Sequence, residues 1–123
     1  MIIGLGIDFV NVNRMRHWTK TDGIIQRFFH PNEVEAAFSR GNSSILSFAA
    51  RFAAKEAFGK ALGTGLKGLK LTDIEVKNNH NGKPEIILHK TALEAFMDLG
   101  GSTMHLSLSH ENDAAVAVVI IEG

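Results

Sequence analysis

The chain has 123 residues, 45% of them hydrophobic and 21% charged, which is typical of one folded domain over residues 1–123 and excludes a disordered chain. The absence of cysteine excludes disulfides, thiolate metal sites and cysteine nucleophiles, and favours a reducing, cytoplasmic location. Formal net charge is zero, which argues against a general nucleic-acid-binding protein. We expect no signal peptide and no membrane-spanning segment, because the N-terminal apolar run meets Asp8 early and no run approaches about 20 residues.

The first segment predicts a strand followed by a basic helix. Residues 3–9 alternate large apolar side chains with two glycines and Asp8, so one face is apolar and Asp8 stands where the chain should leave the sheet. Asn11 or Asn13 can cap a helix that runs through Lys20, with Asp22-Gly23 as its stop.

The middle of the chain predicts two further helices. Pro31 suits the first position of a helix that runs to about Ser39 and ends in the polar segment 41–44. The third helix, residues 45–62, is the longest, and the Gly-Thr-Gly sequence at residues 63–65 stops it.

The second half of the chain predicts two β-hairpins that flank a helix. The first hairpin comprises residues 71–79 and 85–89, and residues 91–99 form the helix. The second hairpin comprises residues 104–109 and 114–121, and the end of its last strand is continuously apolar and therefore central. The whole pattern predicts an α+β fold with helices packed on a largely antiparallel sheet.

The long helix carries the charges that point to chemistry. Both of its faces are apolar, so we expect it to be largely buried, and buried charges are costly unless they are paired or bind a ligand. Arg51 with Lys55 and Glu56 with Lys60 can form ordinary surface pairs at i, i+4. Alternatively, this segment forms an anion site with Glu56 as a metal ligand or base, and the interior Gly59 lets a ligand approach closely.

Asp8 and the glycine loop add to the second interpretation. Together with Glu56, Asp8 can supply two oxygen ligands to Mg²⁺, although it can also simply cap the next helix. Backbone amides of Gly63, Thr64 and Gly65 can contact a phosphate, or the loop is only a helix stop.

Other polar residues leave their roles open. Ser107 and Ser109 lie on one side of a strand, as ligand contacts or as a plain strand end. His80, His89 and His105 lack metal-ligand spacing.

Basic residues gather in the segment after the first strand. Arg14, Arg16 and Lys20 lie between residues 11 and 27, where Asp22 is the only acidic residue. They indicate either one localised acidic partner or a solvated helix face.

Taken together, these segments resemble the holo-acyl-carrier-protein synthase family, the short bacterial type of 4′-phosphopantetheinyl transferase. The matching segments occur in the family's order and span nearly the whole chain. They are Gly4-Leu5-Gly6-Ile7-Asp8, Phe29 through Glu33, Arg51 through Ala57, Lys60 through Gly65, Asn81-Gly82-Lys83-Pro84 and Ser107-Leu108-Ser109-His110.

The resemblance implies an activity and a site. Members transfer the 4′-phosphopantetheine group of coenzyme A to a serine of apo acyl carrier protein and release 3′,5′-ADP, in support of fatty acid biosynthesis. Asp8 and Glu56 would bind Mg²⁺ with the coenzyme A diphosphate. The remaining coenzyme site would be lined by Arg51, Lys60, Gly63, Thr64, Gly65, Asn81, Gly82, Pro84 and His110.

The resemblance also implies an assembly and a mechanism. The family forms homotrimers with active sites between subunits, and the helix bearing Arg14, Arg16 and Lys20 would dock the acidic carrier protein. Lys60 would neutralise phosphate charge, and Glu56 would be the general base, directly or through a metal-bound water.

One departure and two alternative functions accompany this interpretation. Position 30 is histidine where the family usually has serine or threonine, so we expect a weaker cap and a less rigid turn there. A metal-dependent phosphohydrolase could use the same Asp8, Glu56 and Lys60, and a non-catalytic nucleotide-binding trimer would need only the anion site.

Overall fold

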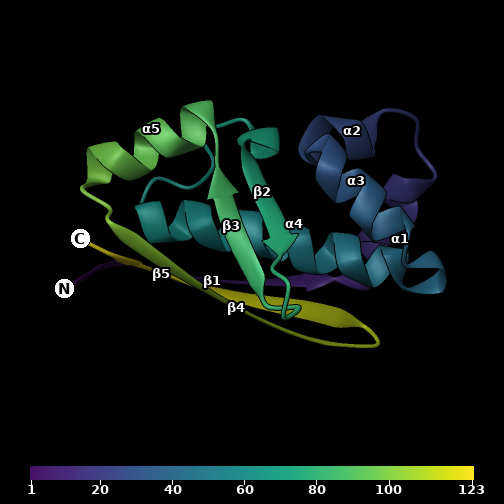
Figure 1. The fold of residues 1–123 in the computed structure, drawn as a ribbon. Helices are drawn as coiled ribbons and strands as arrows, with labels where there is room; N and C mark the ends of the chain where they lie inside the picture. The colour runs from purple at the N-terminus through teal and green to yellow at the C-terminus, as the bar shows by residue number, and fades with distance from the viewer.

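The computed structural model describes residues 1–123 and contains one long helix, four shorter ones and two antiparallel sheets (Figure 1). The elements in chain order are β1 (Ile2–Asn11), α1 (Val12–Thr19), α2 (Ile24–Phe28), α3 (Pro31–Phe38), a 3₁₀ turn (Gly41–Ser43), α4 (Ser44–Leu62), a second 3₁₀ turn (Leu71–Asp73), β2 (Ile74–Asn78), β3 (Pro84–Leu88), α5 (Lys90–Leu99), β4 (Thr103–Glu111) and β5 (Ala114–Glu122).

The larger sheet has the order β1-β5-β4, so the prediction that the last strand is central is confirmed. The expected position of Asp8 at the end of the first strand is wrong. Strand β1 continues to Asn11, because it stays paired with β5 as far as Ala114, and Asp8 lies inside the sheet opposite Ala117. Asn11, and not Asp8, caps α1 by accepting a hydrogen bond from the Asn13 N–H at 2.9 Å.

Helix α4 lies directly on this sheet and is its main cover (Figure 1). A Cβ atom on Gly6 would lie 1.9 Å from the carbonyl oxygen of Ala57, and one on Gly4 would lie 2.1 Å from that of Ala61. Only glycine therefore permits this close approach of strand and helix. Thirteen residues of α4 are buried, as its two apolar faces predict.

The opposite face of the larger sheet is apolar and exposed. Leu5, Ile7 and Phe9 of β1 are 64%, 58% and 66% exposed. Val118 and Ile120 of β5 lie beside Ile7 and Leu5 in the register. The apolar face of the first strand thus points away from the core, while its glycines face α4.

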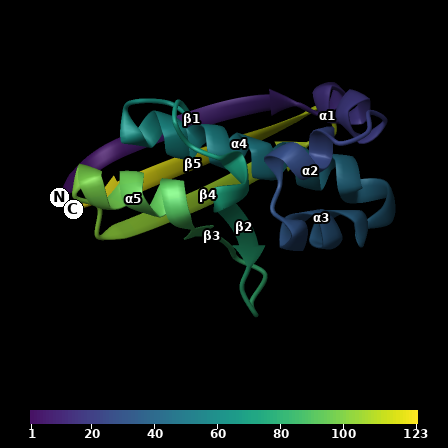
Figure 2. The ribbon, with the colours of Figure 1, turned by 90° about the horizontal axis from the view of Figure 1, so that it is seen from above.

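The remaining elements surround α4 (Figure 2). Helices α1, α2 and α3 gather at its N-terminal end, and α5 lies near its C-terminal end. The β2–β3 hairpin stands beside β4, at the side of the molecule opposite β1. The chain termini lie together, with the Gly123 N–H bonded to the Met1 carbonyl at 3.0 Å. None of the helices combines the length and apolar character that crossing a membrane requires.

Two local expectations need correction. The short helix α2 was not predicted, and Gly23, expected as a stop, precedes α2 in a left-handed conformation with φ 83°. The expected weak cap at His30 is also wrong. The His30 Nδ1 atom accepts the Asn32 N–H at 3.1 Å, and the His30 N–H donates to Glu33 at 3.0 Å, which completes a capping box.

Candidate active site

The charges on α4 divide into buried and accessible groups, and Lys55 belongs to the buried one. Its ammonium donates to Glu33 at 2.6 Å, to the Leu71 carbonyl at 2.7 Å and to the Ile74 carbonyl at 2.6 Å. These acceptors use all three of its protons. Burial lowers the pKa of Lys55, and the charge of Glu33 opposes that shift. Lys55 is therefore part of the core, not of a surface pair with Arg51.

Arg51 is also buried, but its hydrogen bonding is incomplete. One terminal nitrogen donates to the Val76 carbonyl at 3.2 Å, while the Nε atom has no hydrogen-bond partner. Burial lowers the pKa of this guanidinium, yet an arginine stays charged in proteins. A buried, positively charged group with an unused donor is suited to binding an anion.

Arg51 lines a cavity of about 350 Å³ beside the β2–β3 hairpin. Three other residues predicted to contact the coenzyme share this cavity, namely Gly82, Pro84 and His110. Asn81, predicted with them, lies at the hairpin turn and is not among the lining residues; its N–H is bonded to the Asn79 side chain at 2.8 Å. Arg40 also lines the cavity and was not predicted, because nothing in the local sequence distinguishes it from a surface charge.

Asp8, Glu56 and Lys60 form a second group, where α4 crosses β1. The Lys60 ammonium donates to the Asp8 carboxylate and to the Ile7 carbonyl, both at 3.0 Å. Lys60 thus pairs with Asp8 and not with Glu56, so the alternative of a simple Glu56–Lys60 surface pair is wrong. Glu56 has no ion-pair partner.

The environment of Glu56 disfavours its negative charge. Partial burial and the nearby carboxylate of Asp8 raise the pKa of Glu56, while Arg14 and Lys60 oppose the shift. Two carboxylates that repel each other in this way gain most from a shared cation. An oxygen-only donor pair is also the ligand set that Mg²⁺ prefers, with waters or phosphate oxygens in the other positions. Asp8 and Glu56 therefore fit a magnesium ion.

The cavity lined by Arg51 and the group of Asp8, Glu56 and Lys60 lie on opposite sides of α4. Arg51 and Lys60 are nine residues apart, which corresponds to roughly 13 Å along the helix and to opposite helix faces. Arg51 contacts β2, at one side of the molecule, and Lys60 contacts β1, at the other (Figure 2). A single copy of the chain consequently does not bring all the predicted coenzyme contacts together.

The loop after α4 explains Gly59 differently from the expectation. A Cβ atom on Gly59 would lie 2.8 Å from the backbone of Gly65, so the glycine makes room for the loop and not for a ligand. The Gly65 N–H also donates to the Gly59 carbonyl at 2.9 Å. Gly63 ends the helix with φ 85°, and Thr64 lies between the two glycines. The loop is a helix stop that folds back against α4.

The basic residues of α1 do not share one face. Arg14 and Arg16 differ by about 200° around the helix, whereas Arg16 and Lys20 are nearly aligned. The Arg14 guanidinium lies 5.5 Å from the ring centroid of Phe52 and 5.9 Å from that of Trp18. Its charge reaches Glu56, as the pKa of that residue indicates. Arg14 thus borders the Asp8–Glu56 group, while Arg16 points elsewhere.

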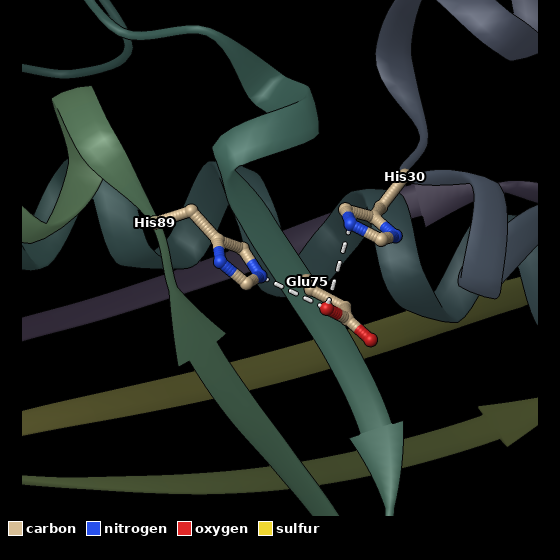
Figure 3. Close-up of side chains that lie close together, drawn as sticks. All are labelled: His30, Glu75 and His89. Atoms are coloured by element: carbon tan, nitrogen blue, oxygen red, sulfur yellow. Dashed lines mark hydrogen bonds and ion pairs between the residues drawn. The ribbon is translucent and has the colours of Figure 1, made fainter.

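A third polar group was missed by sequence reasoning. His30, Glu75 and His89 come together from the start of α3, from β2 and from the residue after β3 (Figure 3). Their separation along the chain gives no motif, so spacing alone could not indicate the group. The packing of α3 on β2 and the pairing of β2 with β3 bring the three residues together.

The chain is similar to known proteins over its whole length. Residues 4–119 match the model of the 4′-phosphopantetheinyl transferase superfamily. The chain is 52% identical over 123 residues, and over the full length of both chains, to a holo-[acyl-carrier-protein] synthase of Treponema denticola. The chain therefore belongs to the 4′-phosphopantetheinyl transferase superfamily and, within it, to the holo-[acyl-carrier-protein] synthases.

Solved structures of such synthases share the fold. One from Neisseria meningitidis superposes with a TM-score of 0.89 at 34% identity and covers all of both chains. Another, from Bacillus anthracis and in complex with CoA (3′,5′-ADP), has a TM-score of 0.82 at 37% identity, over 98% of this chain and 96% of that one. The predicted α+β fold with antiparallel sheets is thus confirmed.

Proposed function

We propose that this protein transfers the 4′-phosphopantetheine group of coenzyme A to a serine of an apo acyl carrier protein and releases 3′,5′-ADP. The observation that carries the proposal is the pair of half-sites on α4. One is a cavity with an unpartnered, buried Arg51 donor. The other is a pair of carboxylates beside Lys60. Anion binding and cation binding by the same helix suit a substrate that carries a diphosphate.

The coenzyme contacts follow from the first half-site. Arg51, which lines the cavity, would donate from its guanidinium to a phosphate of coenzyme A, and His110 would add a second polar contact. The nucleotide would reach the backbone of the hairpin at Gly82 and Pro84, and at Asn81 in the turn. From the second half-site, Lys60 and the Thr64 amide would contact the diphosphate, since the Gly63 and Gly65 N–H groups already donate to the Lys60 and Gly59 carbonyls.

Asp8 and Glu56 would hold magnesium at the second half-site. When bound, the ion neutralises charge on the diphosphate oxygens, which phosphoryl-type transfer requires. Lys60 is already held over Asp8, so its ammonium would reach a phosphate oxygen by a small movement of an exposed side chain. The donor set thus supports an enzyme that depends on Mg²⁺.

The reaction itself needs a base and a stabilised leaving group. The serine oxygen of the carrier bonds to the phosphorus that bears pantetheine, and the bond from that phosphorus to 3′,5′-ADP breaks. The serine proton passes to the Glu56 carboxylate, directly or through a water molecule. Lys60 stabilises the negative charge that the leaving 3′,5′-ADP takes with the bonding electrons.

A cyclic trimer would complete the site. The half-sites lie on opposite sides of the chain, so a head-to-tail ring brings the first half-site of one copy against the second half-site of the next. The exposed apolar sheet face, with Leu5, Ile7 and Phe9, would be buried by the same assembly. A closed ring of three copies would join the two half-sites at each contact between copies. It would also bury the apolar sheet face of every copy.

The carrier protein would approach from α1. Arg14 borders the Asp8–Glu56 group, so an acidic carrier bound there would place its serine near Glu56. Arg16 and Lys20 would attract the same partner from the outer side of the helix. We place the enzyme, with all 123 residues in one domain, in the cytoplasm as part of fatty acid biosynthesis, where coenzyme A and carrier proteins meet.

Mass spectrometry tests the proposed function. The purified protein is incubated with coenzyme A, Mg²⁺ and an apo acyl carrier protein, and the carrier mass is followed. We expect the carrier to gain one phosphopantetheine group, with one 3′,5′-ADP released for each group transferred. Cleavage of coenzyme A without modification of the carrier would indicate a phosphohydrolase, and binding without any product would indicate a non-catalytic protein.

A further inference from the structure

The group of His30, Glu75 and His89 lies outside the site described above. It is the one set of three possible ligand residues in the chain whose donor atoms all lie within 4.8 Å of one another. His30 precedes α3, Glu75 is in β2, and His89 follows β3 (Figure 3). The group therefore joins three elements that are distant in the sequence.

The two imidazole rings converge on one carboxylate oxygen. The Nε2 atom of His89 lies 2.9 Å from Oε1 of Glu75, and that of His30 lies 3.8 Å from the same atom. The rings are stacked, with centroids 5.3 Å apart and planes 18° from parallel. Figure 3 shows both rings pointing their nitrogens at Glu75 from the same side.

Glu75 is a carboxylate fixed through both of its oxygens. His89 contacts Oε1 at 2.9 Å. Asn32 holds the second oxygen at 3.3 Å. The Glu75 side chain is only 5% exposed, whereas those of His30 and His89 are 27% and 38% exposed. One side of the group is therefore open to solvent.

These donors differ in kind from those of the Asp8–Glu56 group. Two imidazole nitrogens and one carboxylate oxygen are a ligand set for Zn²⁺ and its neighbours, with a fourth position left for water, whereas Mg²⁺ prefers oxygen alone. Bonds of about 2.0–2.1 Å place the ligand atoms of tetrahedral zinc roughly 3.3 Å apart. The observed 2.9 and 3.8 Å separations lie on either side of that value.

We propose that His30, Glu75 and His89 bind a divalent transition metal of the zinc class, and that this metal ties the start of α3 to β2 and to the start of α5. The metal would not take part in the transfer reaction. It would stabilise the folded chain, because a ligand that binds only the native state adds to its stability.

Metal binding would change the hydrogen bonding of His30. Its Nδ1 atom accepts the Asn32 N–H, so the neutral ring carries its proton on Nε2. A metal at Nε2 requires that proton to move to Nδ1, and an Nδ1–H can no longer accept the Asn32 N–H. The other half of the capping box, from the His30 N–H to Glu33, remains.

Calorimetry with Zn²⁺ alone tests the site. Tag-free protein is titrated without coenzyme A, whose thiol binds zinc, and with Mg²⁺ in large excess. We expect one zinc per chain and a rise in Tm of several degrees. His30→Ser removes a ligand but keeps a good helix cap, and Glu75→Gln keeps the shape of the side chain. Each should weaken zinc binding by at least about 10-fold, the lower limit for loss of even an indirect contact to a metal.

Two control variants distinguish zinc binding at this group from zinc binding elsewhere on the protein. His17→Gln removes an exposed histidine elsewhere and should bind zinc as the wild type does, and Asp8→Ala should do so as well. The Asn32 amide resonance should shift on zinc binding in the wild type. The proposal is wrong if the wild type binds no zinc at micromolar concentrations, or if His30→Ser and Glu75→Gln both bind it with unchanged affinity.

Discussion

Lys55 and Glu56 are neighbours in the sequence and have opposite situations in the structure. Lys55 is completely buried, and its three protons meet three acceptors, including Glu33. Glu56 is half-buried, lacks an ion-pair partner and has a raised pKa beside Asp8. One step around α4 separates a charge that completes the core from one that is available to a ligand.

This difference shows which charges on a buried helix can be functional. A charge whose hydrogen bonds are all used within the chain serves stability, and its removal leaves a buried partner uncompensated. A charge held near a like charge, or a donor without an acceptor such as Arg51 Nε, has binding capacity left over. Substitutions on the two sides of α4 should therefore affect different measurements.

The largest expected effect is on stability, at the buried pair. Lys55→Met leaves the Glu33 carboxylate without its cation, so the free energy of unfolding should fall by about 3–5 kcal/mol. Urea unfolding measures it. Adding Glu33→Leu should recover only part of the loss, because Glu33 also accepts the N–H groups of His30 and Val76. A loss below about 1 kcal/mol would place Lys55 outside the core network.

The next effect is on activity, at the carboxylates. Asp8→Ala and Glu56→Ala should each lower kcat by about 100-fold or more at saturating Mg²⁺, as loss of a group that stabilises the transition state does. Their free energies of unfolding should change by less than about 1 kcal/mol. Near-normal rates in either variant, measured by carrier modification, would contradict a shared magnesium site.

A smaller effect is expected at the basic helix, where the structure separates two roles. Arg16→Glu should raise the KM for carrier protein several-fold, leave the KM for coenzyme A unchanged, and lose its effect as salt screens the charge. Arg14→Glu should raise the same KM and also lower kcat, since Arg14 lies within reach of Glu56. A large change in the KM for coenzyme A in Arg16→Glu would instead assign α1 to the coenzyme.

The smallest effect is a gain in stability. The pKa of Glu56 is raised in the folded chain, so its charge opposes folding. That cost grows as pH rises above the ordinary pKa of glutamate and is complete above the raised pKa. The free energy of unfolding of Glu56→Gln, measured with urea, should therefore exceed that of the wild type by up to about 0.5 kcal/mol at neutral pH. At low pH the two free energies should be equal. At saturating Mg²⁺ the bound cation favours the charged form of Glu56, so wild-type activity should fall only at a pH below the pKa of the metal-free group. Equal stability at neutral pH would show that its charge is fully solvated.

The sequence was informative where a local pattern determines structure. The two apolar faces of the long helix, the glycine stop at Gly63 and the continuously apolar last strand all report short-range periodicity or backbone conformation. Asp8 and Glu56 could be paired in advance through the family resemblance. The structure adds the physical reason, which is that Gly4 and Gly6 let α4 lie directly on β1.

What could not be predicted depends on contacts between distant segments. Strand β1 runs past Asp8 only because β5 pairs with it, and Gly59 accommodates a loop only because Gly65 folds back. His30 caps α3 although histidine ranks below serine for that position, since its ring is held between Asn32 and the Glu75–His89 pair. The division of the site between two sides of the chain could be expected only from the family resemblance, which implies active sites between subunits.

Complementation between inactive variants tests the central claim, that each active site takes one half from each of two copies. Glu56→Ala lacks the β1 half-site, and the double variant Arg51→Gln, His110→Ala lacks the cavity half-site. Each is expected to be inactive alone. Co-expression in equal amounts should restore carrier modification at about one of the three sites in each mixed ring, or about a quarter of all sites when the copies assemble at random. A mixed assembly that remains inactive, with both variants folded, would contradict the shared site.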